Sequence, residues 1–336
     1  MKFAILHLQH KRGIAMKVKT LSELLSYIRK HMKISGASQK KSLKYMGYFH
    51  GYKGYRYCHK PTNKLAYTNF KQLQAVYDFD MKLKSHLYPS IMFVETALKS
   101  YALECAISQS ESTTFADIFA NSLTYYKTFS LGSNDYNSAM KNRLELRNHI
   151  YSAVSREYPR GIVSHYYDKD EPVPIWAIFE LITLGEFGRF ISCMGKNLKI
   201  HFSSEIGINP KFSTDGKLAE RFVFAIKDLR NAIAHNGTIF DTRFKTANIS
   251  NRISNYLQNE TSIRGINFKT IFDYLVLIIV IMKGLKKPKK GLLSLINAFE
   301  KEYESLRKKI PVSIYNQIAY TNIKSNFGLL RNYIAK

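Results

Sequence analysis

The stretch Lys217–Gly237, KLAERFVFAIKDLRNAIAHNG, has the pattern of an amphipathic helix with a defined stop. Asn236 and Gly237 both tolerate the left-handed backbone conformation in which helices commonly end. The stretch therefore predicts a helix that is packed on one side and polar at its end. Its apolar positions are spaced four, three, four and four apart, as one helix face requires: Leu218, Phe222, Ala225, Leu229 and Ile233.

The end of this predicted helix carries three residues that suit RNA cleavage. Asn231 and His235 are four positions apart, so they share a helix face, and Arg230 lies beside them. A histidine can take the proton of a ribose 2′-hydroxyl, because its unperturbed pKa lies near ~6.5. Arginine can bind the attacked phosphate, and asparagine can orient either partner. We therefore expect an active site at Arg230, Asn231 and His235 with no metal or cofactor, since no metal-binding motif is present.

The Arg-x4-His spacing by itself is a weak signal, because the chain has 10 histidines. Arg143 precedes His149 and Arg160 precedes His165 at similar spacing. Neither pair has an Arg-Asn dipeptide ahead of a helix stop. Residues 230–235 are therefore favoured by this dipeptide and the helix stop together with the spacing, and not by the spacing alone.

Helical patterns also cover most of the remaining chain, which predicts a mainly all-α fold. Thr20 and Glu23 have capping-box spacing at the first of these helices, and Pro89 is a candidate kink in the second. A Tyr- and Gly-rich stretch at 46–57 is expected to be irregular, with small strands as candidates near 47–68. The expected helices cover about 21–32, 70–107, 138–156, 174–194, 215–236, 268–284, 291–309 and 312–335, with a polar linker near 245–266.

The composition points to a polyanionic partner. The 336 residues include 51 Lys and Arg against 25 Asp and Glu, a formal net charge of +26. An AT-rich genome, which enriches lysine in all its proteins, accounts for part of this excess, but nucleic acid is the usual partner of so basic a protein. Three scattered cysteines without a CxxC pair argue against disulfides and zinc. The apolar runs at 3–8 and 274–282 are too short for a signal segment and for a ~20-residue membrane span, so we expect a cytoplasmic protein without a membrane contact.

Two further segments are candidates for RNA contact. In the first, aromatic and basic residues alternate, and we select Lys53, Arg56, Tyr52 and Tyr55 as RNA-binding; packing of the tyrosines against the bundle is the equal alternative. The second is a lysine-rich turn, represented by Lys286 and Lys287, for which a solvated loop is the alternative. We expect Trp176 in the core, and Glu95 either in contact with Arg230 or simply packed.

Several segments in order resemble the Abi-like proteins of phage abortive infection, within the HEPN superfamily that also supplies the RNase domains of type VI CRISPR effectors. The resemblance covers roughly residues 20–245, and the C-terminal 70 residues match less well. The segments that carry it are LKYMGYFHGYKGY (43–55), YDFDMKL (77–83), FVETAL (93–98), PIWAIFELITLGEF (174–187) and DLRNAIAHN (228–236).

The resemblance implies a HEPN-type helical bundle at 17–245. The helical patterns beyond it predict a C-terminal extension at 267–336 that packs on this bundle. It implies a metal-independent endoribonuclease toxin that cuts RNA by 2′-hydroxyl attack at a site shared by two chains of a homodimer. Relatives are inhibited by a small structured RNA or by a protein antitoxin, and both partners stay open here. Inhibition by tyrosine modification is disfavoured, because no tyrosine follows His235 closely. A non-catalytic RNA-binding protein on the same fold is the alternative.

Overall fold

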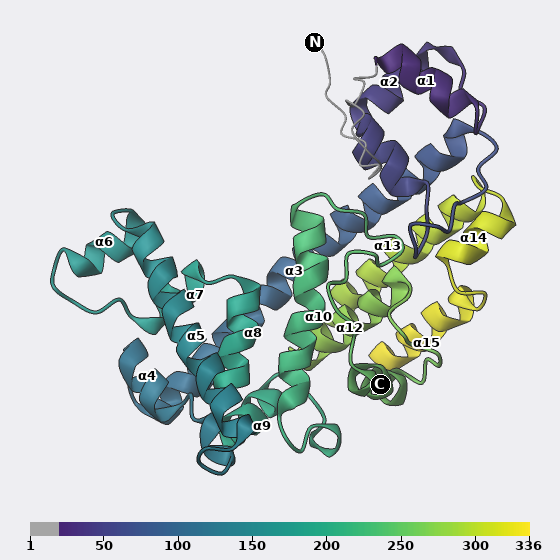
Figure 1. Cartoon of the computed structure of the whole chain (residues 1–336). Helices are drawn as coiled ribbons and strands as arrows, with labels where there is room; N and C mark the ends of the chain where they lie inside the picture. The colour runs from purple at the N-terminus through teal and green to yellow at the C-terminus, as the bar shows by residue number, and fades with distance from the viewer. Residues whose placement is uncertain (1–19) are drawn as a thin grey trace.

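A computed structural model of the chain describes residues 20–336 and is built from helices (Figure 1). Within this range β-structure is limited to three isolated bridges, so the predicted all-α fold is confirmed. The apolar run at 3–8 and the start of the predicted bundle at 17 lie outside the described residues. The elements are α1 (Leu21–Arg29), α2 (Gly36–Met46), η1 (Gly47–Lys53), α3 (Phe70–Ser110), α4 (Phe115–Asn121), η2 (Tyr125–Thr128), α5 (Asn134–Glu157), α6 (Gly161–Tyr167), α7 (Ile175–Leu181), α8 (Leu184–Cys193), α9 (Lys196–Glu205), η3 (Pro210–Phe212), α10 (Lys217–Ala234), α11 (Asn251–Thr261), α12 (Ile271–Gly284), α13 (Lys289–Arg307), α14 (Val312–Ile318) and α15 (Ile323–Ala335).

The long helix α3 runs through the whole molecule and organises the other helices (Figure 1). Its 41 residues span about 60 Å at 1.5 Å per residue. The N-terminal helices α1 and α2 lie near its first turns, and α4 follows its last turn. Helices α7 to α10 pack on one part of α3, and α12 and α13 pack on another. Apolar side chains of α3 are therefore buried along its length, and the helix continues through Pro89.

Helices α8 and α10 approach closely because α8 has two glycines where α10 packs on it. A Cβ atom on Gly188 would lie 2.9 Å from the ring of Phe224, and one on Gly185 would lie 3.4 Å from Cδ of Lys227. Real Cβ atoms almost never approach as closely as the first distance. The absence of a side chain at Gly188 thus lets the Phe224 ring of α10 pack directly on the backbone of α8.

The predicted buried helix at 274–282 is confirmed. In α12 every residue from Ile271 to Met282 is buried, including Asp273 near its start. Helices α3, α11 and α13 surround α12, which explains why its apolar residues do not alternate with polar ones. No helix between residues 20 and 336 is both long and apolar enough to cross a membrane.

Some sequence predictions were wrong about where helices begin and end. The single helix expected at 174–194 is two helices, because Thr183 and Glu186 form a capping box that starts α8 anew. Helix α11 lies inside the expected polar linker, and α14 and α15 divide the last predicted helix. The candidate strands near 47–68 are absent from the structure; the π-helix η1 and a short irregular loop occupy that stretch.

Trp176 is not a core residue as predicted. It is 41% exposed near the start of α7, and its ring meets that of Tyr166 edge to face. Its neighbours Ile175 and Ala177 point into the core instead.

Candidate active site

Helix α10 ends at the predicted stop and presents the three candidate catalytic residues together. The last helical residue is Ala234, and the amide of His235 still donates to the carbonyl of Asn231 at 3.0 Å. Asn236 has a φ of 54°, the left-handed conformation expected at a helix end. Asn231 and His235 are exposed and Arg230 is half-buried, so their polar groups can reach a ligand at this end of α10.

Arg230 is oriented by a carboxylate of α3. Its Nε atom lies 3.1 Å from Oε2 of Glu95, while Lys99 lies 3.5 Å from Oε1 of the same side chain. Of the two alternatives for Glu95, the contact with Arg230 is therefore the one found. Glu95 engages only Nε of Arg230, and Nη1 donates to Oδ1 of Asn231 at 3.5 Å.

Lys99 connects this pair to the start of α8. Its Nζ atom donates to the carbonyl oxygens of Phe179 and Ile182, at 3.1 and 2.9 Å. These carbonyls end α7, just before the capping box of α8. Arg230 thus belongs to a polar chain that joins α10, α3 and the α7–α8 junction.

A buried carboxylate fixes the segment that follows His235. Asp80 of α3 is fully buried, and its Oδ1 atom accepts hydrogen bonds from the amides of Ile239 and Phe240 at 2.8 and 2.7 Å. Its Oδ2 atom accepts from the hydroxyl of Tyr55 at 2.7 Å and lies 2.7 Å from Nζ of Lys84. Four donors converge on one side chain, which satisfies a charge that would otherwise be costly to bury.

Lys84 extends this arrangement to the helix stop itself. Its side chain is 7% exposed, and Nζ donates to Oδ1 of Asn236 at 2.9 Å. Asn236 directly follows His235, so α3 holds the chain on both sides of the histidine, through Glu95 to Arg230 and through Lys84 to Asn236. Asp80 and Lys84 were not predicted as site residues, because the contacts that tie them to residues 236–240 join positions more than 150 apart in the chain.

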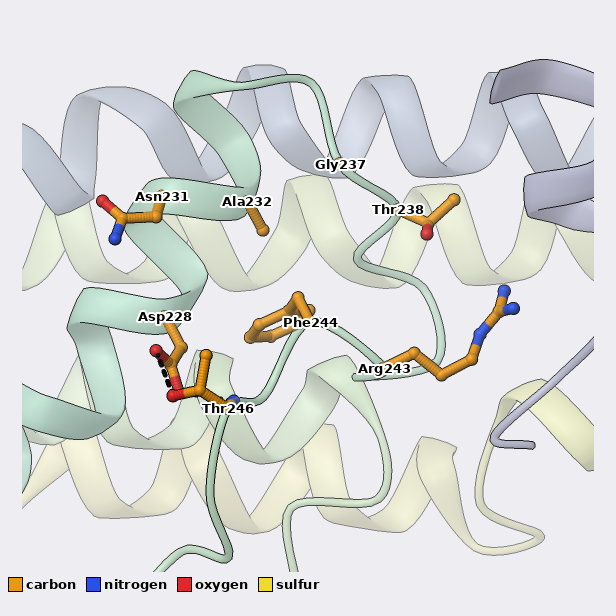
Figure 2. Close-up of a pocket in the computed structure, with 8 residues that line it drawn as sticks. All are labelled: Asp228, Asn231, Ala232, Gly237, Thr238, Arg243, Phe244 and Thr246. Carbon is orange, nitrogen blue, oxygen red and sulfur yellow. Dashed lines mark hydrogen bonds between the residues drawn. The ribbon is translucent and has the colours of Figure 1, made fainter. Parts of the chain in front are cut away.

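A pocket of about 290 Å³ lies where the chain turns back after the motif (Figure 2). Ala232 and Asn231 of α10 form one wall, and the returning segment with Thr238, Arg243 and Phe244 forms the other. At its base, Asp228 accepts hydrogen bonds from the amide and hydroxyl of Thr246 (2.9 and 3.0 Å). The returning segment is therefore tied to α10 two residues before Arg230.

Three of the predicted RNA-binding residues have no surface on which RNA could lie. Tyr52 and Tyr55 are fully buried, and Arg56 is 3% exposed. The Arg56 guanidinium lies 5.3 Å from the centre of the Tyr52 ring, and the Tyr55 hydroxyl donates a hydrogen bond to Asp80. Packing, the alternative stated for the tyrosines, is the arrangement found, and it extends to Arg56. Lys53 is half-buried beside the rings of Tyr27 and Tyr48.

Other residues of the same segment are exposed instead. Tyr45 and Phe49 are 73% and 71% exposed, and Lys41 lies 5.8 Å from the Tyr45 ring. Residues 20–64 contain ten Lys and Arg and only one acid, so this surface is strongly basic. In the lysine-rich turn, Lys286 is exposed, whereas Lys287 packs over the ring of Phe93 at 4.1 Å.

Metal-ligating residues do not gather anywhere between residues 20 and 336: no three His, Cys, Asp or Glu side chains form a candidate metal group. Cys58, Cys105 and Cys193 are free and buried. Burial raises the pKa of Cys58 to about 12 and that of Cys105 and Cys193 to about 11. These thiols are held in the unreactive protonated form.

Comparison with known proteins supports the resemblance found in the sequence. A family model described as Abi-like protein matches residues 41–241, which is more than half of the chain. The matched range contains α3, α8 and α10 and ends just after the segment that Asp80 holds. No curated protein and no solved structure matches the chain.

Proposed function

The chain belongs to the Abi-like protein family, and from this we propose that it is a metal-independent endoribonuclease toxin of the HEPN type. Family membership implies a role in abortive infection. The finer assignment rests chiefly on one observation: Arg230, Asn231 and His235 stand together, accessible to a ligand, at an end of α10 that α3 holds on both sides.

The reaction would be attack of a ribose 2′-oxygen on the adjacent phosphorus. His235 would remove the 2′-hydroxyl proton, the 2′-oxygen–phosphorus bond would form, and the 5′-oxygen of the next nucleotide would leave with a proton. Arg230, fixed by Glu95 through Nε, would offer its Nη atoms to the non-bridging phosphate oxygens. The products are a 2′,3′-cyclic phosphate and a 5′-hydroxyl, and no step requires a metal.

We place the complete site between two chains. One chain supplies one His235, whereas the attacking and leaving oxygens lie on opposite sides of the phosphorus and benefit from a group on each side. A two-fold axis beside the end of α10 would supply the second set, and closed two-fold dimers are the commonest oligomers. Mixing wild-type chains with His235→Ala chains tests this, since shared sites lose more activity than dilution predicts. Activity proportional to the wild-type fraction would contradict the dimer.

The decisive experiment compares RNA cleavage by the wild type with that by Arg230→Ala and His235→Ala. We expect both variants to fold and neither to cut, while His165→Ala, a distant exposed histidine, cuts normally. Cleavage should persist in EDTA and stop when the scissile nucleotide is 2′-deoxy. A folded His235→Ala protein that still cuts RNA would refute the site. Wild-type protein that binds RNA without cutting it would favour the alternative, a non-catalytic RNA-binding protein.

We also propose an RNA as the inhibitory partner, because the net charge of +26 favours a polyanion. The basic surface of residues 20–64, with exposed Lys40, Lys41 and Lys44, is the candidate contact, together with Lys286. Binding through phosphates should weaken steeply with salt as counterions are released. Purification with a stoichiometric acidic protein and no RNA would instead support a protein antitoxin.

A further inference from the structure

A groove lies on the side of α10 that faces α5 and α8. It consists of two hollows of about 330 and 470 Å³ that share Asn142, Ser192 and Glu220 on their walls. The first reaches Lys217 at the start of α10, and the second reaches Lys227 ten residues later. Ten helical residues span about 15 Å, so the two hollows form one elongated feature. We call it the α10 groove.

Aromatic side chains occur at intervals along the α10 groove. Tyr125 and Phe129 line its first part, with ring centres 5.3 Å apart. Phe224 lines the second part and is 37% exposed although α8 lies directly beneath its ring. An exposed ring in a hollow offers a flat face on which a nucleobase can stack.

Cations accompany these rings. Lys217 and Arg221 line the first part, and Arg189 and Lys227 line the second. Several charged groups of the groove have partners. Glu220 lies 3.5 Å from buried Lys199, and Glu186 accepts from the amide of Thr183 at 2.6 Å. Arg189 lies 3.0 Å from Glu145, and Lys227 lies 3.2 Å from Asp228. The lining has more cations than acids, five against three, so the α10 groove is basic: Lys199, Lys217, Arg221, Arg189 and Lys227 against Asp135, Glu220 and Glu186.

The far end of the α10 groove leads to the motif. Lys227 precedes Arg230 by one helical turn, and Thr183 on the groove wall follows Ile182, whose carbonyl belongs to the Lys99–Glu95–Arg230 chain. A polymer lying along α10 would thus pass from the groove directly to Arg230 and His235.

We propose that the α10 groove binds single-stranded RNA on one side of the cleaved phosphate, with bases on Phe224 and on Tyr125 or Phe129, and phosphates on Lys227 and Lys217. Interleaved rings and cations in a narrow groove suit an unpaired strand, because a duplex hides its base faces. This inference rests on the proposed function and gives its substrate a path distinct from the basic surface of residues 20–64.

The test measures binding of a fluorescein-labelled single-stranded RNA 12-mer to the full chain carrying His235→Ala, by fluorescence anisotropy over a range of salt. Adding Phe224→Ala and Lys227→Gln should raise Kd about tenfold or more, since one stacked base and one phosphate contact are lost. The salt dependence of log Kd should also decrease by about one. The matched control is Tyr151→Ala with Lys301→Gln: Tyr151 is 52% exposed on the other face of α5, and Lys301 is exposed on distant α13.

An equal Kd for the groove variant and the control variant would overturn the inference. So would loss of a dimer in sedimentation with RNA affinity unchanged, because the groove would then be a contact between copies. If the double variant misfolds by circular dichroism, Lys227→Gln alone carries the salt-dependence test. Cleavage is measured separately on chains that keep His235. RNA that binds in the groove of these chains but is never cut refutes only the proposed function, whereas RNA cut equally well with and without the two groove substitutions refutes only this inference.

Discussion

Replacing Asp80 by asparagine tests whether a buried carboxylate stabilises the segment that follows the C-terminal end of α10. Asparagine keeps one acceptor oxygen, so the bonds from the Ile239 and Phe240 amides to Oδ1 can persist. At the Oδ2 position its NH2 group would face the hydroxyl of Tyr55 and the ammonium of Lys84, which are both donors. The variant loses two hydrogen bonds and leaves a nearly buried ammonium without its carboxylate. Breaking a buried pair in this way costs about 3–5 kcal/mol.

Urea unfolding followed by circular dichroism measures this loss, and hydrogen exchange of residues 236–240 shows where it acts. Asp78→Asn is the matched control, because that aspartate is exposed on the same helix and should change stability by less than about 0.5 kcal/mol. Adding Lys84→Met to Asp80→Asn removes the stranded charge and should restore part of the stability. If Asp80→Asn and Asp78→Asn unfold at the same urea concentration with equal exchange, the Asp80 contacts do not stabilise this segment.

Three further results are expected. Glu95→Gln should lower the RNA cleavage rate about ten- to hundredfold, because Arg230 loses the carboxylate that orients it. The free energy of unfolding, measured in urea, should fall by at most about 1 kcal/mol. An unchanged cleavage rate would show that Glu95 only packs. Gly188→Ala should destabilise the chain by about 1–3 kcal/mol, because its Cβ would meet the Phe224 ring at 2.9 Å, whereas Gly185→Ala, at 3.4 Å from a flexible lysine, should be tolerated in thermal unfolding. Burial raises the pKa of Asp273 from 3.8 to about 6, so the folded state binds a proton at higher pH than the unfolded state does. The free energy of unfolding should therefore rise as pH falls from 7 to 4, by up to about 3 kcal/mol relative to Asp273→Asn. Parallel pH profiles of stability for the two proteins would contradict this.

Local signals in the sequence predicted the parts of the fold that local interactions determine. The apolar stripe of residues 217–234, the stop at Asn236 and the capping box at Thr20 were all confirmed, because each depends on neighbours within a few residues. The same kind of signal was available at Thr183 and Glu186. It divides 174–194 into two helices, but the continuous apolar pattern obscured it.

The unpredicted parts depend on partners that are distant in sequence. Asp80 contacts residues 159 and 160 positions later. Helical spacing places it on the buried stripe of α3 between Val76 and Leu83, unlike the exposed Asp78, but this position does not reveal its partners. In the Tyr- and Gly-rich segment, alternating aromatic and basic residues suggested a surface. Three-dimensional packing instead turned Tyr52, Tyr55 and Arg56 inward and left Tyr45 and Phe49 outside. Sequence composition gives the chemistry of such a segment but not the direction of each side chain.

The packing of α12 and α13 on α3 shows that the family match ends before the folded unit does. The family match ends at residue 241, yet α3 inside it depends on helices beyond that point to cover its apolar side. Gln317 of α14 also reaches back, accepting through its carbonyl from the thiol of Cys58 at 3.4 Å and meeting Nε2 of His59 at 2.8 Å. A chain emerging from the ribosome would therefore contain Arg230, Asn231 and His235 before it has made the helices that cover α3. Truncation after residue 241 should leave the apolar side of α3 uncovered, so the proposed active site depends on helices that come after it in the chain.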